Sequence, residues 1–332
     1  CCSRQQRTKL NQFLEKIFAA LHKEGEVFSL DEILDFLSHN PDVVEINSKC
    51  GIKFKRRFDG QSVPKLKKIR KVERALIVGC GSIGQRHVQN LKKLGIKEIS
   101  ALRTRKGHFQ NLPEDLEVIE LNSENELKDS RFDIAIISNP SSLHLETVEQ
   151  ISDQVSGIFI EKPFSDKLDG CVETAEMLSK KHVVSFVGHN LMFHPAIKGI
   201  LSFINESDMG EILNLQCQVG QWLPDWHPYE DYKKAYYARK DLGGGVSSTM
   251  IHEIHLATQF AGLPTEVFGL FSGSELLKLD VDVCSDLMIR HSSMAVSQIH
   301  LDFIQKPLHR SGMISFENGW ASYDFNRNKA YG

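Results

Sequence analysis

The stretch ALIVGCGSIGQRH, residues 75–87, decides the fold of this chain. It opens with a short apolar run, and glycines follow in a G-x-G-x-x-G spacing. A buried strand that ends in such a turn and leads into a helix presents free backbone N–H groups to a phosphate. The stretch therefore predicts a dinucleotide-binding unit, and the alternative is a turn with only a structural role. The cofactor-binding residues expected here are Gly79, Gly81, Ser82, Ile83 and Gly84.

The chain beyond this stretch alternates short apolar runs with helical patterns. Strands are expected at 98–102, 133–138, 157–161 and 183–188, and helices at about 82–94, 141–152 and 170–181. Such alternation predicts an α/β fold with a Rossmann doubly wound parallel sheet. After Asn190, residues 212–220 and several later runs alternate apolar with polar side chains. One-sided alternation predicts a second α/β domain with a largely antiparallel open sheet, whose free face is open to a substrate or partner.

Composition divides the chain into four parts. We expect a helical segment over 1–48, a basic linker over 49–73, a dinucleotide-binding Rossmann domain over 74–190 and a truncated substrate and oligomerisation domain over 191–332. Residues 49–74 carry eleven Lys and Arg against Asp59 and Glu73, without a long apolar stripe. This is typical of a solvated linker, and an anionic partner is the alternative. The chain starts with Cys-Cys and stops at NRNKAYG, so we expect both ends to be cut.

The overall composition is that of an ordinary soluble protein. Of the 332 residues, 41% are hydrophobic and 25% are charged, and the net charge is −3. This balance gives no reason to expect nucleic acid or a membrane surface as a partner. The seven cysteines are scattered, without a metal or redox spacing. We therefore predict a cytoplasmic protein and no metal site.

The second strand of the predicted Rossmann domain bears on the choice of dinucleotide. An NAD site usually places Asp or Glu about 20 residues beyond the first glycine. Here the strand continues as ALRTRKG, residues 101–107, with Arg103 and Arg105 and no carboxylate. A guanidinium can hold a 2′-phosphate through two hydrogen bonds. The sequence favours NADP, with NAD possible, and the alternative is that these arginines belong to a solvated turn.

Polar residues follow two further strands at their carboxyl ends. The run SNPSSLH covers residues 138–144, and IEKPF covers 160–164. In open α/β sheets, ligands bind beyond the carboxyl ends of the strands, where the topology switches. Lys162 is therefore expected to point into a nicotinamide cleft, where an amine can exchange a proton with a reacting hydroxyl. The alternative is a surface lysine.

These residues, taken in order, resemble the Gfo/Idh/MocA oxidoreductases. The resemblance covers about residues 74–332 and rests on GCGSIGQRH, the Asn139-Pro140 turn with His144, Glu161-Lys162-Pro163, VGHNLMFHP and Gly243-Gly244-Gly245. It implies an NAD(P)-dependent enzyme that acts on a sugar, a cyclitol or a derivative, with a large open sheet often used for homo-oligomerisation. It also implies that Lys162 is catalytic and that the Lys162–Pro163 bond is cis. On the cofactor side it implies contacts from Asn139, Pro140, His144, Glu161 and Lys162.

The second part of the implied chemistry departs from the family pattern. Members often have Asp four residues after the third glycine and His four residues further on, but this chain has Thr249 and Glu253 there. The run resembles a branch with GGG…D-x-x-H-E, linked to bacterial surface-sugar biosynthesis, in which His252 is retained. We expect His252 to be an acid/base, and the alternative is a structural histidine. His252 and His255 could share a helix face, but no third metal ligand accompanies them.

Aromatic and polar residues in the second domain are candidates for the substrate pocket, because aromatic faces suit the C–H surfaces of sugars. The alternative for each is packing. Met192 stands where the family often has Arg, which puts a contact to an anionic substrate there in doubt. The candidates are His194, Trp222, Asp225, Trp226, His227 and Tyr232.

The first part of the chain carries a second resemblance. Residues 10–50, with the pattern NPDVVEIN, resemble the C-terminal tail of surface-polysaccharide sugar cytidylyltransferases and contain no nucleotide-binding core. This implies a sugar that becomes nucleotide-activated. The sequence thus predicts a sugar dehydrogenase or reductase in surface-polysaccharide or nucleotide-sugar biosynthesis. The alternative is a dinucleotide-binding scaffold or sensor with impaired catalysis.

Overall fold

The structure is a computed structural model, which describes residues 44–47, 51–54, 72–104, 112–121, 126–127 and 130–332. The chain separates into two units, residues 1–71 and 72–332. In the first unit, β1 (Val44–Asn47) pairs antiparallel with β2 (Gly51–Phe54). The predicted boundary between a helical segment and a linker at residue 48 therefore falls between two paired strands. Apart from residues 44–47, the helical segment expected over 1–48 lies outside the described residues.

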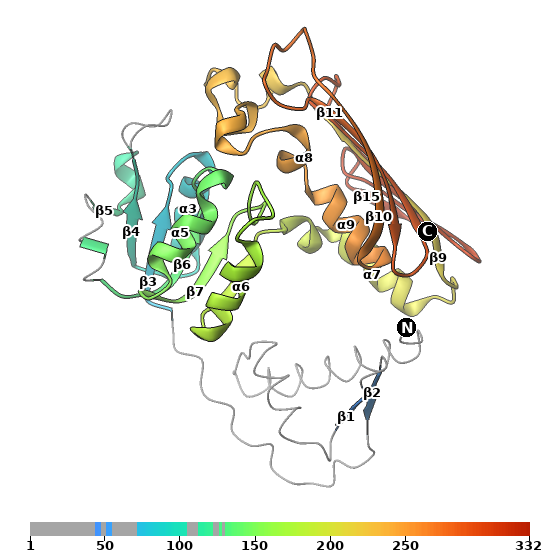
Figure 1. Ribbon diagram of the computed structural model, residues 1–332, viewed down its shortest axis with the longest axis horizontal. Coiled ribbons are helices and arrows are strands. Elements are labelled where there is room, and N and C mark those ends of the chain that lie inside the picture. Colours follow the sequence, from blue (N-terminus) through green and yellow to red (C-terminus); the bar gives the residue numbers. More distant parts are fainter. Residues whose placement is uncertain (1–43, 48–50, 55–71, 105–111, 122–125, 128–129) are drawn as a thin grey trace. The chain divides into compact units, whose positions relative to one another are not determined.

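The second unit begins with a six-stranded, wholly parallel sheet (Figure 1). Its strands are β3 (Arg74–Val78), β4 (Glu98–Leu102), β5 (Ile119–Leu121), β6 (Phe132–Ile137), β7 (Val155–Ile160) and β8 (Val184–Val187). They lie in the order β5-β4-β3-β6-β7-β8. After β5 the chain returns to the other side of β3, so the topology switches between β3 and β6. The crevice at this switch point is where an α/β sheet of this order binds its ligand.

Helices cover both faces of this sheet, as the apolar strands require. On one face, α3 (Ser82–Lys93) packs through Val88 and Leu91. On the other, α5 (His144–Ile151) and α6 (Cys171–Lys180) pack over Leu76, Ile137 and Ile160. Two short 3-10 helices, Glu114–Leu116 and Ser141–Leu143, complete the domain. Because both faces are covered, the strands are almost continuously apolar.

A seven-stranded sheet forms the second domain (Figure 1). Its strands are β9 (Ile212–Gly220), β10 (Pro264–Ser272), β11 (Cys284–His291), β12 (Val296–Asp302), β13 (His309–Phe316), β14 (Gly319–Asp324) and β15 (Lys329–Tyr331). The order is β10-β11-β12-β9-β13-β14-β15, and only β12 and β9 pair in parallel. The helices are α7 (Pro195–Glu206), α8 (Val246–Thr249) and α9 (His252–Ala261), with 3-10 helices at Asn190–Phe193, Leu223–Asp225, Tyr232–Lys234, Tyr236–Ala238 and Lys240–Leu242.

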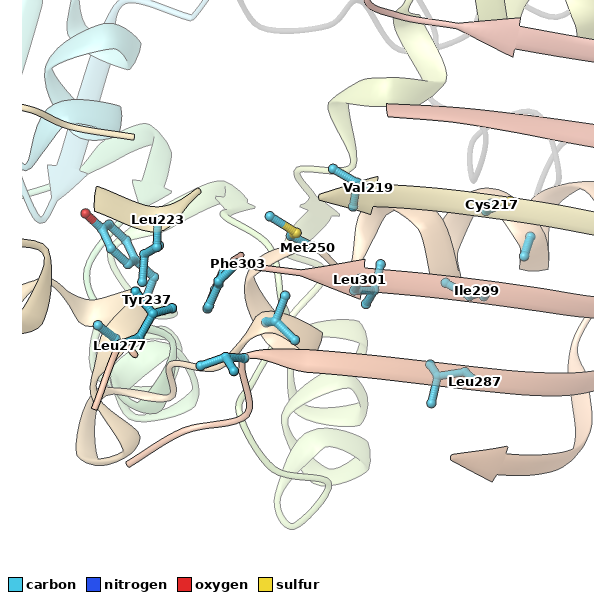
Figure 2. Close-up of a cluster of buried hydrophobic side chains, with 14 of the residues drawn as sticks. Cys217, Val219, Leu223, Tyr237, Met250, Leu277, Leu287, Ile299, Leu301 and Phe303 are labelled. Carbon is cyan, nitrogen blue, oxygen red and sulfur yellow. The ribbon is translucent and has the colours of Figure 1, made fainter. Parts of the chain in front are cut away.

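One face of this sheet is covered and the other faces outward. Alternate residues such as Cys217, Ile299 and Leu301 enter a core that also takes in Met250 and Phe303 (Figure 2). A second cluster packs α7 and α9 on the same sheet. The alternation found in the sequence therefore reflects one-sided burial. No helix in the described part of the chain combines the length and the apolar character needed to cross a membrane.

Candidate active site

The Gly-rich turn lies between β3 and α3, at the switch point of the sheet. Gly79 has a φ of +87°, and a Cβ there would lie 2.6 Å from the backbone nitrogen of Asn139. A Cβ on Gly84 would lie 2.1 Å from the carbonyl oxygen of Gly79, whereas one on Gly81 would have nothing within 4 Å. Gly79 and Gly84 are thus required by the packing of the chain itself. Gly81 leaves an open backbone surface.

The start of α3 is suited to an anion. Gly81 is the N-cap residue, and within the described residues no side chain caps the helix. Its first backbone N–H groups therefore remain available, and the macrodipole favours negative charge at this end. Ser82 and Ile83 form the first turn. These features fit the pyrophosphate of a dinucleotide, and the chemistry of the turn needs no charged side chain.

Arg103 lies just beyond β4, but its guanidinium does not project into solvent. Its side chain is only 5% exposed, and Nη1 lies 3.8 Å from Oε1 of Glu120 on β5. The pairing of β5 with β4 brings Glu120 close to Arg103, and no pattern in the sequence indicated this pairing. A carboxylate beside Arg103 offsets part of the charge that a 2′-phosphate would meet. Arg105 lies outside the described residues.

His144, the first residue of α5, ties two strand-end loops together. Its side chain is buried, with Nε2 3.0 Å from the carbonyl oxygen of Asn139 and Nδ1 2.9 Å from that of Pro163. Pro140, next to Asn139, is the N-cap of the 3-10 helix that precedes α5. Burial lowers the pKa of His144. The structure therefore brings the predicted residues of both loops together and gives His144 a positioning contact.

Lys162 follows β7, next to a cis Lys162–Pro163 peptide bond. Its ammonium Nζ donates a hydrogen bond of 2.7 Å to the carbonyl oxygen of Thr249 in α8. Burial lowers the pKa of Lys162 from 10.5 to about 8, with Arg310 adding to the effect and Glu161 and Glu253 opposing it. A lysine with a pKa near neutrality can give or accept a proton under working conditions.

Glu161, which precedes Lys162 in the chain, contacts a histidine of helix α3. Its Oε1 lies 2.6 Å from Nε2 of His87, a residue of α3, and both side chains are largely buried. Tyr236 also lies in this environment: burial raises its pKa to about 12, and the carboxylates of Glu161 and Glu230 add to the effect. The structure therefore joins the helix of the Gly-rich turn to the strand-end lysine through one carboxylate.

The run of three glycines forms the joint between the two domains. Gly243 has a φ of +78°, and a Cβ there would lie 2.5 Å from Oγ of Ser141. Ser141, which lies in the loop after β6, donates a hydrogen bond of 3.1 Å to the Gly243 carbonyl oxygen. Thr249, four residues past the third glycine, thereby reaches Lys162. It contacts Lys162 through its backbone carbonyl oxygen, while its buried side-chain hydroxyl has no hydrogen-bond partner among the described residues.

His252 lies at the start of α9 and is buried. Burial lowers its pKa to about 2, and the positive charges of Lys162 and Arg310 add to the effect. Within the described residues its Nδ1 has no hydrogen-bond partner. The imidazole is therefore neutral and offers a hydrogen-bonding atom rather than a charge.

Two further histidines complete this group: His189, which the sequence analysis did not consider, and His255, which it considered only as a metal ligand. His189 follows β8, and its ring stacks on that of His255 with centroids 3.8 Å apart and an interplanar angle of 3°. It also meets His252 edge-on at 6.0 Å. Burial lowers the pKa of His189 to about 4, and interactions with His255 and Lys162 contribute. The signal that could have found His189 is its place two residues beyond the end of a parallel strand.

The predicted substrate residues divide into two groups. His194 caps α7, because its Nδ1 accepts a hydrogen bond of 3.2 Å from the backbone N–H of Ala196. Trp226 packs edge-on against Tyr237 and Phe303 in the core. The remaining candidates lie on the excursion between β9 and α8, with Asp225 exposed and the others partly buried: Trp222, Asp225, His227 and Tyr232.

A buried ion pair joins helix α9 of this site to strand β13. Glu253, in the first turn of α9, is fully buried and accepts hydrogen bonds from Nε of Arg310 at 2.7 Å and from Nη2 at 3.0 Å. The two-pronged geometry holds the carboxylate in place without a solvent contact. The pair fixes α9, which carries His252, against β13.

Replacing Arg310 with alanine is expected to lower the free energy of unfolding by about 3–5 kcal/mol, because Glu253 would be left buried and uncompensated. Chemical denaturation monitored by circular dichroism measures the change. The double variant Arg310→Ala with Glu253→Gln should recover part of the loss, since it removes the buried charge. A loss below about 1 kcal/mol in the single variant would show that the pair does not hold α9.

Two family models match this part of the chain. Residues 73–189 match the NAD-binding Rossmann fold of the Gfo/Idh/MocA oxidoreductase family, and residues 199–322 match the C-terminal domain of the same family. The fold defines a two-domain protein of the NAD-binding Rossmann class. The chain belongs to the Gfo/Idh/MocA family, since the two matches together cover more than half of it.

Two curated relatives are oxidoreductases by name. The chain is 31% identical over 199 residues to the uncharacterized oxidoreductase YrbE of Bacillus subtilis (strain 168), covering 58% of this chain and 55% of that protein. It is 24% identical over 124 residues to the D-xylose dehydrogenase of Paenarthrobacter nicotinovorans, covering 37% of this chain and 32% of that protein. The chain thus spans about half, or less, of the length of these curated relatives.

A solved structure confirms the predicted fold class. The UDP-N-acetylglucosamine 3-dehydrogenase GnnA from Acidithiobacillus ferrooxidans matches with a TM-score of 0.64 and 19% identity. The match covers 79% of this chain and 80% of that one. At this identity the likeness concerns the fold alone.

Proposed function

We propose that this protein is an NAD(P)-dependent oxidoreductase that transfers a hydride between a nicotinamide cofactor and a CH–OH carbon of a sugar or sugar derivative. The observation that carries the proposal is the partly buried Lys162, with a pKa of about 8, at the sheet edge where the Gly-rich turn lies. The names of the relatives, an oxidoreductase and a D-xylose dehydrogenase, support the same class.

Lys162 handles the proton of the reaction. A bound nicotinamide ring supplies or accepts the hydride. In the oxidation direction the neutral Lys162 amine accepts the hydroxyl proton, and in the reduction direction the ammonium donates a proton to the carbonyl oxygen. For His252, expected from the sequence as an acid/base, we propose the role of a neutral hydrogen-bonding group of the site, since its pKa is lowered to about 2 and Thr249 offers no negative charge to stabilise an imidazolium.

For cofactor binding we propose the same residues that the sequence analysis predicts. Pyrophosphate is held at the N-terminus of α3 by the turn that contains Gly79, Gly81, Ser82, Ile83 and Gly84. Asn139, Pro140, His144, Glu161 and Lys162 form the nicotinamide side. We propose NADP as the preferred cofactor, with NAD possible, through Arg103 and Arg105.

Replacing Arg103 with alanine is expected to weaken NADPH binding at least tenfold, about 1.4 kcal/mol, and to leave NADH binding nearly unchanged. The reason is that only NADPH carries the 2′-phosphate. Fluorescence titration of both dinucleotides measures the effect. Arg131→Ala, at the opposite end of the sheet before β6, is the matched control. Equal losses for both dinucleotides would instead assign Arg103 a packing role beside Glu120.

The rate should depend on pH with a midpoint of about 8, the pKa of Lys162. In the oxidation direction the neutral amine is needed, so kcat/KM should rise about tenfold per pH unit below the midpoint and level off above it. In the reduction direction the ammonium is needed, so the rate should fall above the midpoint. Opposite slopes in the two directions test the assignment. Profiles with the same slope in both directions would contradict it.

The substrate is proposed to be a sugar of surface-polysaccharide or nucleotide-sugar biosynthesis. Support comes from the resemblance of residues 10–50 to a sugar cytidylyltransferase tail, which lies largely outside the described residues, and from the substrate named for GnnA. A panel of free sugars, cyclitols and UDP- and CMP-activated sugars, read by reduced-nicotinamide absorbance, tests this. Turnover of free sugars or cyclitols alone would reject the nucleotide-sugar part. The proposed contacts are His194, Trp222, Asp225, Trp226, His227 and Tyr232.

A second candidate is a dinucleotide-binding scaffold or sensor with impaired catalysis. Thr249, in place of the family's aspartate, favours it, because the carbonyl oxygen of Thr249 holds the Lys162 ammonium without any side-chain charge. Tight NADH or NADPH binding without turnover across the whole panel would support this candidate. Any substrate with turnover that depends on Lys162 would reject it.

We also propose a cytoplasmic homo-oligomer that associates through the outward face of the large sheet. Phe268, Leu270 and Met288 lie on that face and are 63%, 62% and 51% exposed. An apolar patch of this kind marks an interaction surface. Light scattering after size-exclusion chromatography tests the proposal, with Leu270→Asp expected to shift the protein toward monomer. A monomeric wild type would reject it.

A further inference from the structure

A compact group of four side chains lies on β11 and β12, away from the proposed active site. Cys284 and Asp286 are two residues apart on β11, and His300 and Asp302 are two apart on β12. The register pairs Cys284 with Asp302 and Asp286 with His300. Residues two apart on a strand share a face, so all four project from one face of the sheet. We name them the β11–β12 cluster.

The β11–β12 cluster projects from the outward face. The intervening residues Leu287, Ile299 and Leu301 point into the core that underlies the sheet (Figure 2). That core is on the side of α9 and His252. The cluster therefore lies across the sheet from Lys162, and neither the hydride-transfer proposal nor the family assignment gives it a role.

Three different donor atoms converge in the cluster. Nδ1 of His300 lies 2.7 Å from Oδ1 of Asp286, and Sγ of Cys284 lies 3.8 Å from Oδ2 of the same carboxylate. One donor atom from each of the three residues lies within 4.8 Å of the other two. A tetrahedron around an ion with metal–ligand distances of about 2.0–2.3 Å has edges of about 3.3–3.8 Å. The sulfur–oxygen separation already fits this edge, and the histidine nitrogen and the carboxylate oxygen, which are hydrogen-bonded here, would move apart by about 0.6 Å to share the ion.

A buried carboxylate orients the histidine from its other side. Oδ2 of Asp302 lies 3.1 Å from Nε2 of His300, while Oδ1 accepts hydrogen bonds from the backbone N–H groups of Ile304 at 2.8 Å and Gln305 at 2.6 Å. The side chain of Asp302 is only 3% exposed. Both ring nitrogens of His300 thus lie within hydrogen-bond distance of a carboxylate, and an ion bound at Nδ1 would replace the hydrogen shared with Asp286 while Nε2–H stays directed at Asp302. Carboxylate–histidine pairs of this kind hold metal-binding imidazoles in the correct tautomer.

The neighbouring strand makes room for this arrangement. Gly220 is the residue of β9 that pairs with Asp302. A Cβ on Gly220 would lie 2.2 Å from Oδ2 of Asp302. The absence of a side chain at position 220 therefore allows the carboxylate to reach His300. Three strands thus contribute to the position of one imidazole.

We propose that Cys284, Asp286 and His300 bind a divalent ion of the zinc class, with Asp302 as the positioning residue for His300. A thiolate, an imidazole and a carboxylate are the ligand types that Zn²⁺ takes, whereas Mg²⁺ and Ca²⁺ favour oxygen ligands alone. Three protein ligands leave a fourth position for water or another ligand. The proposal replaces the sequence-based expectation of no metal site, which considered only spacing along the chain.

Cobalt binding to the whole chain tests the proposal. The protein is stripped with a chelator and titrated with Co²⁺, whose thiolate complexes absorb strongly through sulfur-to-metal charge transfer. We expect one such site that Zn²⁺ displaces. Cys284→Ala should abolish this band, His300→Ala should weaken binding at least 100-fold, and Asp302→Asn should weaken it about 10–100-fold.

Controls separate the site from other thiols and from loss of folding. Cys171→Ala removes a partly exposed free cysteine on α6 and should leave the spectrum unchanged. Cys1, Cys2 and Cys50 lie outside the described residues, so the readout is the difference between wild type and Cys284→Ala. If Cys284→Ala does not fold, as judged by circular dichroism, the cobalt titration is repeated with Asp286→Asn. The Asp286 side chain is well exposed, so this variant should fold and should bind cobalt more weakly. Unchanged cobalt spectra and affinities in these variants would overturn the proposal and leave the group as an ion-pair cluster only.

Discussion

Replacing Lys162 with alanine is expected to lower kcat by about 10²–10⁴-fold, the contribution typical of a positioned acid/base. The Lys162 amine at the end of β7 has a pKa of about 8, which suits proton exchange with a hydroxyl. Dinucleotide binding should be largely retained: Lys162 is proposed to contact only the nicotinamide side, and the turn before α3, where the pyrophosphate is proposed to bind, does not depend on this side chain. Initial rates of nicotinamide reduction on the best substrate of the panel measure the effect.

Lys167→Ala provides the matched control for this variant. Lys167 is an exposed lysine five residues further along the same loop, and it should retain wild-type rates. A melting curve of each variant separates loss of folding from loss of chemistry. If Lys162→Ala folds, binds the dinucleotide and keeps full turnover, the role proposed for Lys162 is wrong and the proton must move through another group.

The second large effect is expected at the Gly-rich turn, where two neighbouring glycines should behave differently. Gly84→Ala should destabilise the Rossmann domain by about 1–3 kcal/mol or more, because its Cβ would lie 2.1 Å from a backbone oxygen that cannot rotate away. Gly81→Ala should change stability by at most about 1 kcal/mol, since its Cβ has nothing within 4 Å. It should nevertheless weaken dinucleotide binding at least tenfold, because a methyl group would stand where the pyrophosphate approaches.

Thermal unfolding and fluorescence titration together measure this difference. The expected result is a stability loss in Gly84→Ala and an affinity loss in Gly81→Ala with a normal melting temperature. If Gly81→Ala binds NADH and NADPH as the wild type does, the pyrophosphate does not lie at this turn. If Gly84→Ala has the melting temperature of the wild type, the close contact between residue 84 and the Gly79 carbonyl oxygen does not limit stability.

Much of the fold could be predicted because its signals are local. The apolar runs before Gly79, Asn139 and Lys162 each proved to be a buried parallel strand, and their polar ends meet at the carboxyl edge of one sheet. The one-sided alternation of 212–220 likewise became β9, with one face in the core. The short elements were missed. Strand β5 has three residues and helix α8 has four, too few for a period to show.

The candidate site was only partly predictable, because its contacts join distant residues. Lys162 could be identified from its place after a strand, but not its hydrogen bond to a carbonyl oxygen 87 residues away. The stacking of His189 on His255 and the approach of Glu120 to Arg103 also depend on how elements pack. Polar contacts between residues that are distant in the chain produce no periodic pattern in the sequence.

The sequence by itself determined the order of the longer strands and helices, the Gly-rich turn after β3 and the position of Lys162 at a strand end. These features depend on residues close together in the chain: the period of the apolar side chains sets each strand or helix, and the glycines allow the turn. The tertiary structure alone decided which groups share an environment: the carbonyl oxygen that receives the lysine, the arginine that neutralises Glu253 and the four side chains of the β11–β12 cluster. The physical reason is that burial and charge act through space, so a pKa or a ligand set exists only once distant segments pack together.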